Sequence, residues 1–526
     1  MAANTTHADD TRDTTRRSTD GLWTRIRTNP QPALRWGVVA AVLVVLELGA
    51  LTGGILTLVD ALVMGVTGLI DVIVGLVSPA LAGRVVDVQL ALSTFIEGVR
   101  STAQSLPTLL SRDVIPNQGY NDPSTVRSFL GLSYNAWTGP FLGLSPAAAW
   151  AIRMALTLAY SLFTFYWLYR GWLTFRTHYR RAGWTPRDDM VNRLRNHSWG
   201  KFGIVVLVLF LTMSLFGTTL APSTVQQNIT ASYGNEVQYV SDDTGAVETI
   251  PVGEANFNSK SKGNPAQNVG VMTYDDYGRF HPFGTLPNGR DLFTYMMGGA
   301  ETTLMVTGIA IGMAGFIAAL LALVSSYYGG TVDLSVLTLA DGIVSIPQLL
   351  LLIMVSVVFQ DHWLKSVFNG GLLLALVFGL TTWPVLWRSL RGPALQVAEE
   401  EWVDAAKSFG QQPTVTMRKH MLPYVLGYLL IYASMTVGGI VIAMASLSFL
   451  GNGLGITPPT PAWGRAISQG QPYVSSASWH IALIPGLIIV VLVTGANALG
   501  DGIRDAIDPE SEGGSEEEAA ATGGGA

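Results

Sequence analysis

Long apolar stretches alternate with polar segments along most of this chain. Each apolar stretch carries at most one Asp, Glu, Lys or Arg, and the stretches run over residues 36–59, 147–168, 202–221, 302–327, 334–359, 370–387, 424–449 and 480–500. A helix needs about 20 residues to cross the apolar layer of a bilayer. The pattern therefore predicts an all-α polytopic membrane protein with eight spans.

The stretch after the first span has two interpretations. Apolar residues continue past residue 59 through Asp60 and Asp71 to Leu81. Residues 60–82 either lie along the membrane surface or extend the first span as one long tilted helix. We do not count them as a ninth span, because that would place the N-terminal arginines on the opposite side of the membrane from the other basic segments.

Basic residues mark one side of the predicted bundle. Eight arginines and lysines fall between Arg170 and Lys201, and a second group lies between Arg388 and Lys419. Short loops rich in Lys and Arg stay in the cytoplasm. Both segments are therefore predicted to be cytoplasmic.

Eight spans then determine the side of every other segment. The polar, Arg-rich residues 1–35 and the C-terminus fall in the cytoplasm. Residues 83–145 and 222–293 fall outside, and the second segment, rich in Asn, Gly, Asp, Thr and Tyr, is predicted to hold short strands.

Composition supports the membrane class and narrows the chemistry. Of 526 residues, 49% are hydrophobic and 13% are charged, whereas about a quarter are charged in a soluble domain. The chain has no cysteine, and its seven histidines are scattered without metal-ligand spacing. We expect no metal site, no cofactor and no nucleic-acid partner in this chain.

The polar segment between the sixth and seventh predicted spans has an ordered pattern. Asp404-Ala405-Ala406 is followed by Gly410, and the segment closes at Leu422-Pro423. The small alanines leave one helix face open to close approach by another protein. Gly410 can adopt the left-handed conformation that ends a helix, and Pro413 suits the first turn of the next. The pattern predicts a helix, a turn and a second helix.

This segment resembles the EAA loop of ABC importer permeases, whose short helix docks on an ATP-hydrolysing subunit. The family pattern is Glu-Ala-Ala, three residues, Gly, nine residues, Ile, any residue and Leu-Pro. Asp404 stands in place of the Glu and His420 in place of the Ile. The resemblance assigns an ATPase-coupling role to Asp404, Ala405, Ala406, Gly410, His420, Leu422 and Pro423 within a loop over 391–423.

Other segments are similar to the C-type subunit of dipeptide, oligopeptide and nickel permeases. The matching motif positions are Gly289, Arg290, Asp291, Asp341, Pro347, Asp501 and Arg504. Two positions depart from the subfamily pattern: Leu286 replaces an acidic residue, and Glu301 replaces an arginine. The resemblance implies a six-helix permease core over 201–510.

The rest of the chain divides around that core. Residues 1–35 are predicted to be a polar cytoplasmic N-terminus, and 36–200 an extension with about two transmembrane helices, an external segment and a basic cytoplasmic loop. Residues 511–526 form an acidic, low-complexity tail that is predicted to be disordered.

The resemblance also implies the assembly and its energy source. The chain has no Gly-rich phosphate loop of the form GxxxxGK[ST], so ATP and Mg²⁺ are expected on two partner ATPase subunits. A related second permease would complete the translocation path as a heterodimer in the lipid of the plasma membrane. An external binding protein would deliver the cargo, for which dipeptides, oligopeptides, nickel complexes and sugars remain open.

Two other classes of protein compete with this interpretation. An ion-coupled secondary transporter would use intramembrane acids such as Glu47, Glu301 or Asp341, and it would need inverted repeats or paired broken helices. An intramembrane enzyme would need a nucleophile with its base, or a metal cluster. The sequence shows neither set of features, and we expect a transporter subunit rather than an enzyme.

Overall fold

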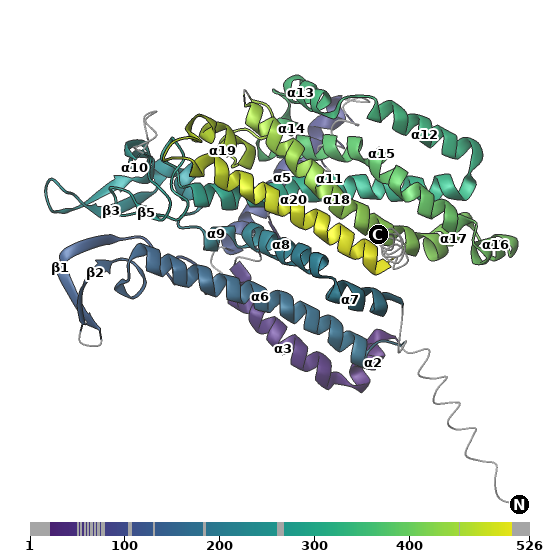
Figure 1. Cartoon of the computed structure of the whole chain (residues 1–526), viewed down its shortest axis with the longest axis horizontal. Helices are drawn as coiled ribbons and strands as arrows, with labels where there is room; N and C mark the ends of the chain where they lie inside the picture. Colours follow the sequence, from purple (N-terminus) through teal and green to yellow (C-terminus); the bar gives the residue numbers. More distant parts are fainter. Residues whose placement is uncertain are drawn as a thin grey trace, which may run out of the picture.

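Long helices lying side by side make up most of the computed structural model (Figure 1). The structure describes residues 21–49, 79–103, 108–129, 132–181, 186–259, 268–451 and 453–507, together with scattered positions between 52 and 74. The predicted N-terminal segment up to residue 20, most of the ambiguous stretch 60–82 and the acidic tail lie outside these residues.

Among the described residues, six continuous helical stretches are long and apolar enough to cross a membrane. They are α6 (Pro146–His178), α8 (Ser198–Leu215), α11 (Leu292–Tyr328), Val367–Ala398, Pro413–Leu450 and α20 (His480–Ile507). Two bent pairs pass the same test, namely α2 (Leu22–Thr28) with α3 (Pro30–Leu46), and α12 (Gly330–Val344) with α13 (Gln348–Val358). With each pair taken as one span, the described residues hold eight spans, and the predicted all-α polytopic class is confirmed.

Several helices differ in length from the predicted spans. Within the stretches above, α15 covers Gly371–Ala398 and α18 covers Leu422–Leu450. The helix α6 continues to His178, so that Arg170 and Arg176 belong to the helix and not to the loop. The helix α3 ends at Leu46 instead of reaching residue 59. These differences arise because hydropathy marks only the membrane-embedded part of a helix, whereas capping and packing determine where the helix ends.

The span predicted over 334–359 is broken in the middle. The axes of α12 and α13 differ by 73° across Ser345–Pro347. Proline has no backbone N–H to donate and its ring clashes with the preceding turn, which explains why the first helix stops there. By contrast, α15 runs without a break through Pro384 and Pro393.

Strands and short helices connect the spans. Three antiparallel hairpins pair β1 (Tyr120–Phe129) with β2 (Leu132–Thr138), β3 (Glu236–Val240) with β4 (Val247–Pro251), and β5 (Thr273–Tyr274) with β6 (Phe280–His281). The α-helical connections are α5 (Pro79–Ala103), α7 (Pro186–Asn196), α9 (Gly217–Leu220), α10 (Val252–Asn258), α14 (Trp363–Ser366), α16 (Glu401–Ser408), α17 (Pro413–Thr416) and α19 (Trp463–Gly470). Single turns of other helix types are η1 (Phe141–Gly143), η2 (Gln226–Thr230), η3 (Ser232–Gly234), η5 (Val367–Gly370), η6 (Met417–Met421) and η7 (Gln471–Tyr473).

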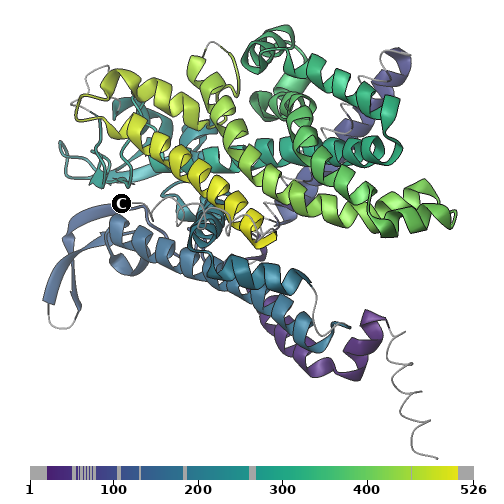
Figure 2. The ribbon, with the colours of Figure 1, turned by 45° about the vertical axis from the view of Figure 1, so that its right-hand side comes forward.

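The two ends of the helix layer differ in structure. The hairpins and α10 gather at the left end in Figure 1, and α16 and α17 project at the right end. Short strands are therefore present in 222–293, as predicted. Figure 2 shows α6 lying along α3 at the edge of the layer, with the β1–β2 hairpin beyond its end.

Small residues let the central helices approach closely. Ala310, Ala314, Ala318 and Ala322 recur every four residues along α11 and are fully buried. They pack in two clusters that also hold large side chains of α15, among them Phe378 and Trp387. The close contact of α8 with α20 depends on glycine, because a Cβ on Gly502 would lie 2.6 Å from the Cα of Gly200. Such small-residue contacts are typical of membrane helices.

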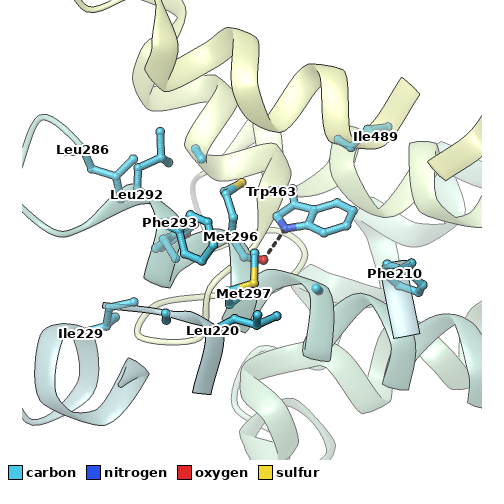
Figure 3. Close-up of a cluster of buried hydrophobic side chains, with 14 of the residues drawn as sticks. Phe210, Leu220, Ile229, Leu286, Leu292, Phe293, Met296, Met297, Trp463 and Ile489 are labelled. Carbon is cyan, nitrogen blue, oxygen red and sulfur yellow. Dashed lines mark hydrogen bonds between the residues drawn. The ribbon is translucent and has the colours of Figure 1, made fainter. Parts of the chain in front are cut away.

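A third cluster closes the strand-bearing end of the bundle (Figure 3). The indole Nε1 of Trp463, on α19, donates a hydrogen bond to the Met296 carbonyl of α11 at 3.0 Å. Phe210 of α8 and Ile489 of α20 pack in the same cluster. The loops at this end are thereby fixed to the spans that they connect.

The buried Arg153 helps to join the N-terminal extension to the helices that follow. The Arg153 side chain is fully buried in α6. Its guanidinium donates to the carbonyls of Ile115, Thr219 and Ala221 and to the Asn117 side chain, each at 2.8 Å. Nearby, Trp150 donates to the Leu220 carbonyl at 2.8 Å. The extension and the end of α9 therefore share one buried hydrogen-bond network.

Replacement of Arg153 by Met should separate these parts. Four buried oxygens would lose a charged donor, and we expect the free energy of unfolding to fall by about 3 kcal/mol. Thermal unfolding of the detergent-purified protein would measure the loss. The matched variant Arg170→Met, at an exposed position of the same helix, should leave the transition unchanged. Equal shifts for both variants would contradict this role of Arg153.

Candidate functional site

Residues 399–423 form an exposed elbow between α15 and α18. Its first half is α16, and its second half is α17 followed by η6, which leads directly into α18. Both halves project from the end of the molecule opposite the hairpins (Figure 2). The loop predicted over 391–423 is shorter in the structure, because residues 391–398 belong to α15.

The helix α16 has a buried face and an open face. Val403 is completely buried, and it lies in the same cluster as Trp387 and Met421. On the open side Asp404 and Ala405 are exposed, and the Phe409 side chain is 92% exposed. The first half of the elbow is thus anchored by Val403 and presents Phe409 to its surroundings.

Lys407 connects the elbow to two neighbouring helices. Its ammonium donates to the Ala398 carbonyl at 3.3 Å and lies 5.3 Å from the ring centre of Tyr327 on α11. It also approaches Asp404 at 3.4 Å. An ammonium near an aromatic face is attracted by the ring, so Lys407 stiffens the link between the elbow and the bundle.

Gly410 ends α16 as the sequence predicts. Its φ of +76° lies in the left-handed region. The Gly410 N–H donates to the Lys407 carbonyl and the Gln411 N–H to the Ala406 carbonyl, both at 3.0 Å. These two bonds form a Schellman motif, which satisfies the last carbonyls of a helix. Pro413 occupies the first turn of α17, also as predicted.

The second half of the elbow is held by polar and apolar contacts. The buried Thr416 hydroxyl donates to the Gln411 side chain at 3.0 Å. Leu422 packs against the cluster that contains Val403. His420 is half-buried, and Pro423 is exposed in the first turn of α18.

All seven predicted coupling residues therefore lie in one elbow, and three of them, Ala406, His420 and Leu422, are half-buried. The sequence interpretation did not include Phe409, whose side chain is the most exposed large apolar one in the elbow. An apolar residue beside the turn glycine, within an otherwise polar segment, was the signal for it.

The other predicted motif positions lie in three separate places. Gly289, Arg290 and Asp291 precede α11 at the hairpin end. Asp341 and Pro347 flank the break between α12 and α13, and Asp501 and Arg504 lie in the last turns of α20. They do not converge on one site.

The acids considered for ion coupling also lie apart. Glu47 is fully buried after α3, where its Oε1 accepts a hydrogen bond from the Leu110 N–H at 2.8 Å. Glu301 is half-buried in α11. Asp341 forms an ion pair with Arg388 of α15. Glu47 follows α3, Glu301 lies in α11 and Asp341 lies in α12, so the three acids belong to different parts of the fold.

A buried charge network precedes α11 at the hairpin end. The Asp291 carboxylate accepts from the Thr294 N–H at 2.6 Å and lies 2.8 Å from His281 Nδ1. Arg279 Nε donates to Asp275 at 2.7 Å, and His281 Nε2 lies 3.4 Å from the same carboxylate. The sequence interpretation missed Asp275 and Arg279, although their four-residue spacing across a Gly-containing turn was a signal.

Charge pairing outweighs burial in this network. Burial raises the pKa of the Asp275 carboxyl, but Arg279 and His281 together hold that pKa well below its usual range. Burial lowers the pKa of His281. The hydrogen bonds to Asp275 and Asp291 raise that pKa by more than burial lowers it, so the net shift is upward. When His281 is protonated, the two positive charges of Arg279 and His281 therefore neutralise the two negative charges of Asp275 and Asp291.

Known proteins resemble the second part of the chain. The family model described as the inner membrane component of binding-protein-dependent transport systems matches residues 311–512, which include the whole elbow.

Individual relatives match over a similar length. The dipeptide transport system permease protein DppC of Alkalihalophilus pseudofirmus is 33% identical over 230 residues, or 44% of this chain and 72% of the relative. The probable D,D-dipeptide transport system permease protein DdpC of Escherichia coli is 34% identical over 233 residues, or 44% and 74%. The glutathione transport system permease protein GsiD of Escherichia coli strain 536 is 33% identical over 233 residues, or 44% and 73%.

The charge network should make stability depend on pH in a defined way. The raised pKa of His281 contributes stability that is complete below about 6.5, its usual value, and that is lost as the pH rises through the folded-state pKa. The lowered pKa of Asp275 contributes stability that is complete above about 3.9 and lost as the pH falls through its folded-state pKa. We expect thermal stability to be highest between these limits.

The variant His281→Gln tests the alkaline side of this profile. It should be less stable than the unchanged protein and should lose the decline above about pH 6.5 that His281 causes. Melting temperatures from pH 4 to pH 9 would measure both effects. The exposed His178 supplies the control, since His178→Gln should keep the original profile. An unaltered alkaline decline in His281→Gln would show that His281 is not its source.

Proposed function

Because the chain belongs to the family of inner membrane components of binding-protein-dependent transport systems, the permeases of ABC importers, we propose that the elbow 399–423 couples it to an ATP-hydrolysing partner. The chain is a multi-pass membrane protein and a transporter subunit. Permeases of this family work with ATPase subunits, a second permease and a substrate-binding protein.

The exposure of Phe409 is the single observation that carries this proposal. A large aromatic side chain at the tip of an ordered, polar elbow leaves apolar area in water, and burial of that area favours association. Aromatic side chains are also enriched among the residues that contribute most to protein interfaces. Ala405 beside it lets the partner approach the α16 backbone.

The elbow can transmit force in both directions along the chain. α15 leads into it and α18 leads out of it, and Val403 and Leu422 fix it to the cluster between these helices. Movement of α16 by a closing pair of ATPase subunits would shift both spans as one unit. The partner must bind one conformation of the permease more tightly than the other for ATP binding to drive the switch.

The source of energy lies outside this chain in our proposal. The sequence has no GxxxxGK[ST] phosphate loop, and we assign ATP and Mg²⁺ to the two partner subunits. The permease supplies the path and the elbow, and it has no ATPase site of its own.

We place the elbow and both termini in the cytoplasm. The basic α7 lies near the end of α20, where His197 Nε2 is 3.1 Å from Asp505. α16 and α17 project at the end opposite the hairpins (Figure 1). The positive-inside rule favours the cytoplasm for the basic end. The hairpin end would then face the binding protein.

The proposed cargo is small peptides. The names of three relatives refer to dipeptides, D,D-dipeptides and glutathione, all of which are peptides of two or three residues. A second permease would complete the path as a heterodimer. Uptake of labelled dialanine by vesicles with the full transporter tests the cargo directly, and absence of ATP-dependent uptake of small peptides would argue against it.

The docking role of Phe409 can be tested by truncation. Phe409→Ser should weaken binding of the ATPase subunits at least about tenfold, because loss of a central aromatic anchor costs about 2 kcal/mol. Folding should be unaffected, since the side chain has little contact with the chain. The amount of ATPase that co-purifies with the permease pair measures binding.

An exposed aromatic at the other end provides the control. The Tyr233 side chain is 71% exposed at the hairpin end, and Tyr233→Ser should retain full ATPase binding. If the Phe409 variant binds ATPase as well as the Tyr233 variant does, the elbow is not the docking site.

A further inference from the structure

Polar side chains follow the line where α12 and α13 meet α15. Asp341 and Arg388 form an ion pair across this line, and Gln348 Nε2 donates to the Thr381 hydroxyl at 3.1 Å. Ser345 lies between them at the break of the two helices. We call these five residues the polar seam.

The polar seam lies at the depth of the membrane. Arg388 comes ten residues before the end of α15 at Ala398, which places it about 15 Å from that end at about 1.5 Å per residue. Its partner Asp341 lies within the apolar stretch 334–359, and Thr381 lies within the stretch 370–387, which ends directly before Arg388. The seam therefore runs from inside the apolar layer to its boundary at Arg388.

The seam is open on the surface of this subunit. The side chains of Arg388 and Asp341 are 41% and 60% exposed, and residues 344–350 are exposed without interruption. Charged side chains at this depth are costly in lipid and almost always face protein or a water-filled space. The seam therefore does not face acyl chains.

The broken backbone supports the same conclusion independently. Between α12 and α13, residues 345–347 interrupt the helical hydrogen-bond ladder in the middle of a span. Non-helical backbone at membrane depth occurs only where protein buries it or where it lines water. Since Ser345, Ile346 and Pro347 are exposed in this subunit, they require water or another protein beside them.

A second ion pair also joins these helices. Arg391 Nε donates to Asp333 at 2.8 Å, and the Arg391 guanidinium lies 5.9 Å from the ring centre of Trp387. The Asp333 side chain is only 13% exposed. This sheltered pair already joins α12 to α15, so the open Asp341–Arg388 pair is available for another role.

We propose that the polar seam lines the translocation path and binds the two charged ends of a small peptide. Asp341 would receive the ammonium group, and Arg388 the carboxylate. The inference deepens the proposed function and rests on it. In the empty path the two side chains pair with each other, and a zwitterionic peptide exchanges that pair for two charge-assisted contacts. The exchange is nearly balanced, which suits a site that a cargo must also leave.

The absence of cysteine from the chain allows a direct test of the water-filled path. Ser345→Cys, in the complete transporter in vesicles, should react with a charged methanethiosulfonate reagent at least about tenfold faster than Val205→Cys. Val205 is the matched control, because its side chain is 56% exposed on an apolar face of α8. Dialanine during turnover should slow the reaction at Ser345→Cys and leave Val205→Cys unchanged.

Two outcomes of this labelling would overturn the inference. If Ser345→Cys reacts as slowly as Val205→Cys, the seam is covered by the second permease or by lipid. If it reacts rapidly but dialanine gives no protection, the seam is wet and does not contact the cargo.

Charge substitutions test the assigned contacts. Arg388→Gln and Asp341→Asn should each reduce uptake of labelled dialanine at least about tenfold and abolish its protection of Ser345→Cys, while the ATPase subunits still co-purify. Arg388→Lys keeps the charge and should retain uptake within about threefold. Assembled variants that transport dialanine at the original rate would refute the contacts.

The failure of this inference is distinguishable from failure of the proposed function. If the unchanged transporter takes up no small peptide at all, the proposed cargo is wrong. If it takes up dialanine and the seam variants do so equally well, only the polar seam is wrong.

Discussion

The need to satisfy every polar group without water determines how this structure is held together. A bilayer offers no hydrogen-bond partners, and Arg153 shows how strictly the chain obeys this constraint. Its guanidinium reaches four oxygens from two segments, 115–117 and 219–221, and no acid is among those partners. A buried charge without partners would be far more costly, so the positions of these segments are fixed together. The same logic applies to Ser214, whose hydroxyl donates to the Ala300 carbonyl at 3.0 Å and so ties α8 to α11.

Close packing of small residues also stabilises the contacts between helices within the bundle. Lipid tails are as apolar as leucine, so helices gain little from hiding apolar side chains and associate mainly through close contact. The alanines of α11 and the paired Gly200 and Gly502 provide that contact. In the elbow, by contrast, the burial of large apolar side chains contributes to stability. The elbow lies outside the apolar layer, where Val403 gains by leaving water and Phe409 remains open to a partner.

The sequence was sufficient for the class and the form of the elbow, and its eight predicted spans match the described residues when each bent helix pair is counted as one span. Hydropathy identifies spans because the bilayer imposes their length, and Gly410 and Pro413 specify a turn by local backbone preference. It was not sufficient for the helix ends, as α3 and α6 show. It also could not identify the charge network of Asp275, Arg279, His281 and Asp291, or the partners of Arg153, because those contacts join residues far apart in the chain or depend on tertiary burial. The motif resemblance identified Asp341, but it predicted neither the ion pair with Arg388 nor the exposure of the Asp341 side chain.

The Arg153 network has a consequence for biosynthesis. Arg153 is made before Thr219 and Ala221, the source of two of its four acceptors, so the growing chain carries an arginine in α6 whose partners do not yet exist. Its position seven residues after the start of α6 at Pro146 lets the side chain wait among lipid headgroups near the membrane surface. We therefore expect Arg153 to gain its full set of partners only after residues 219–221 have been synthesised.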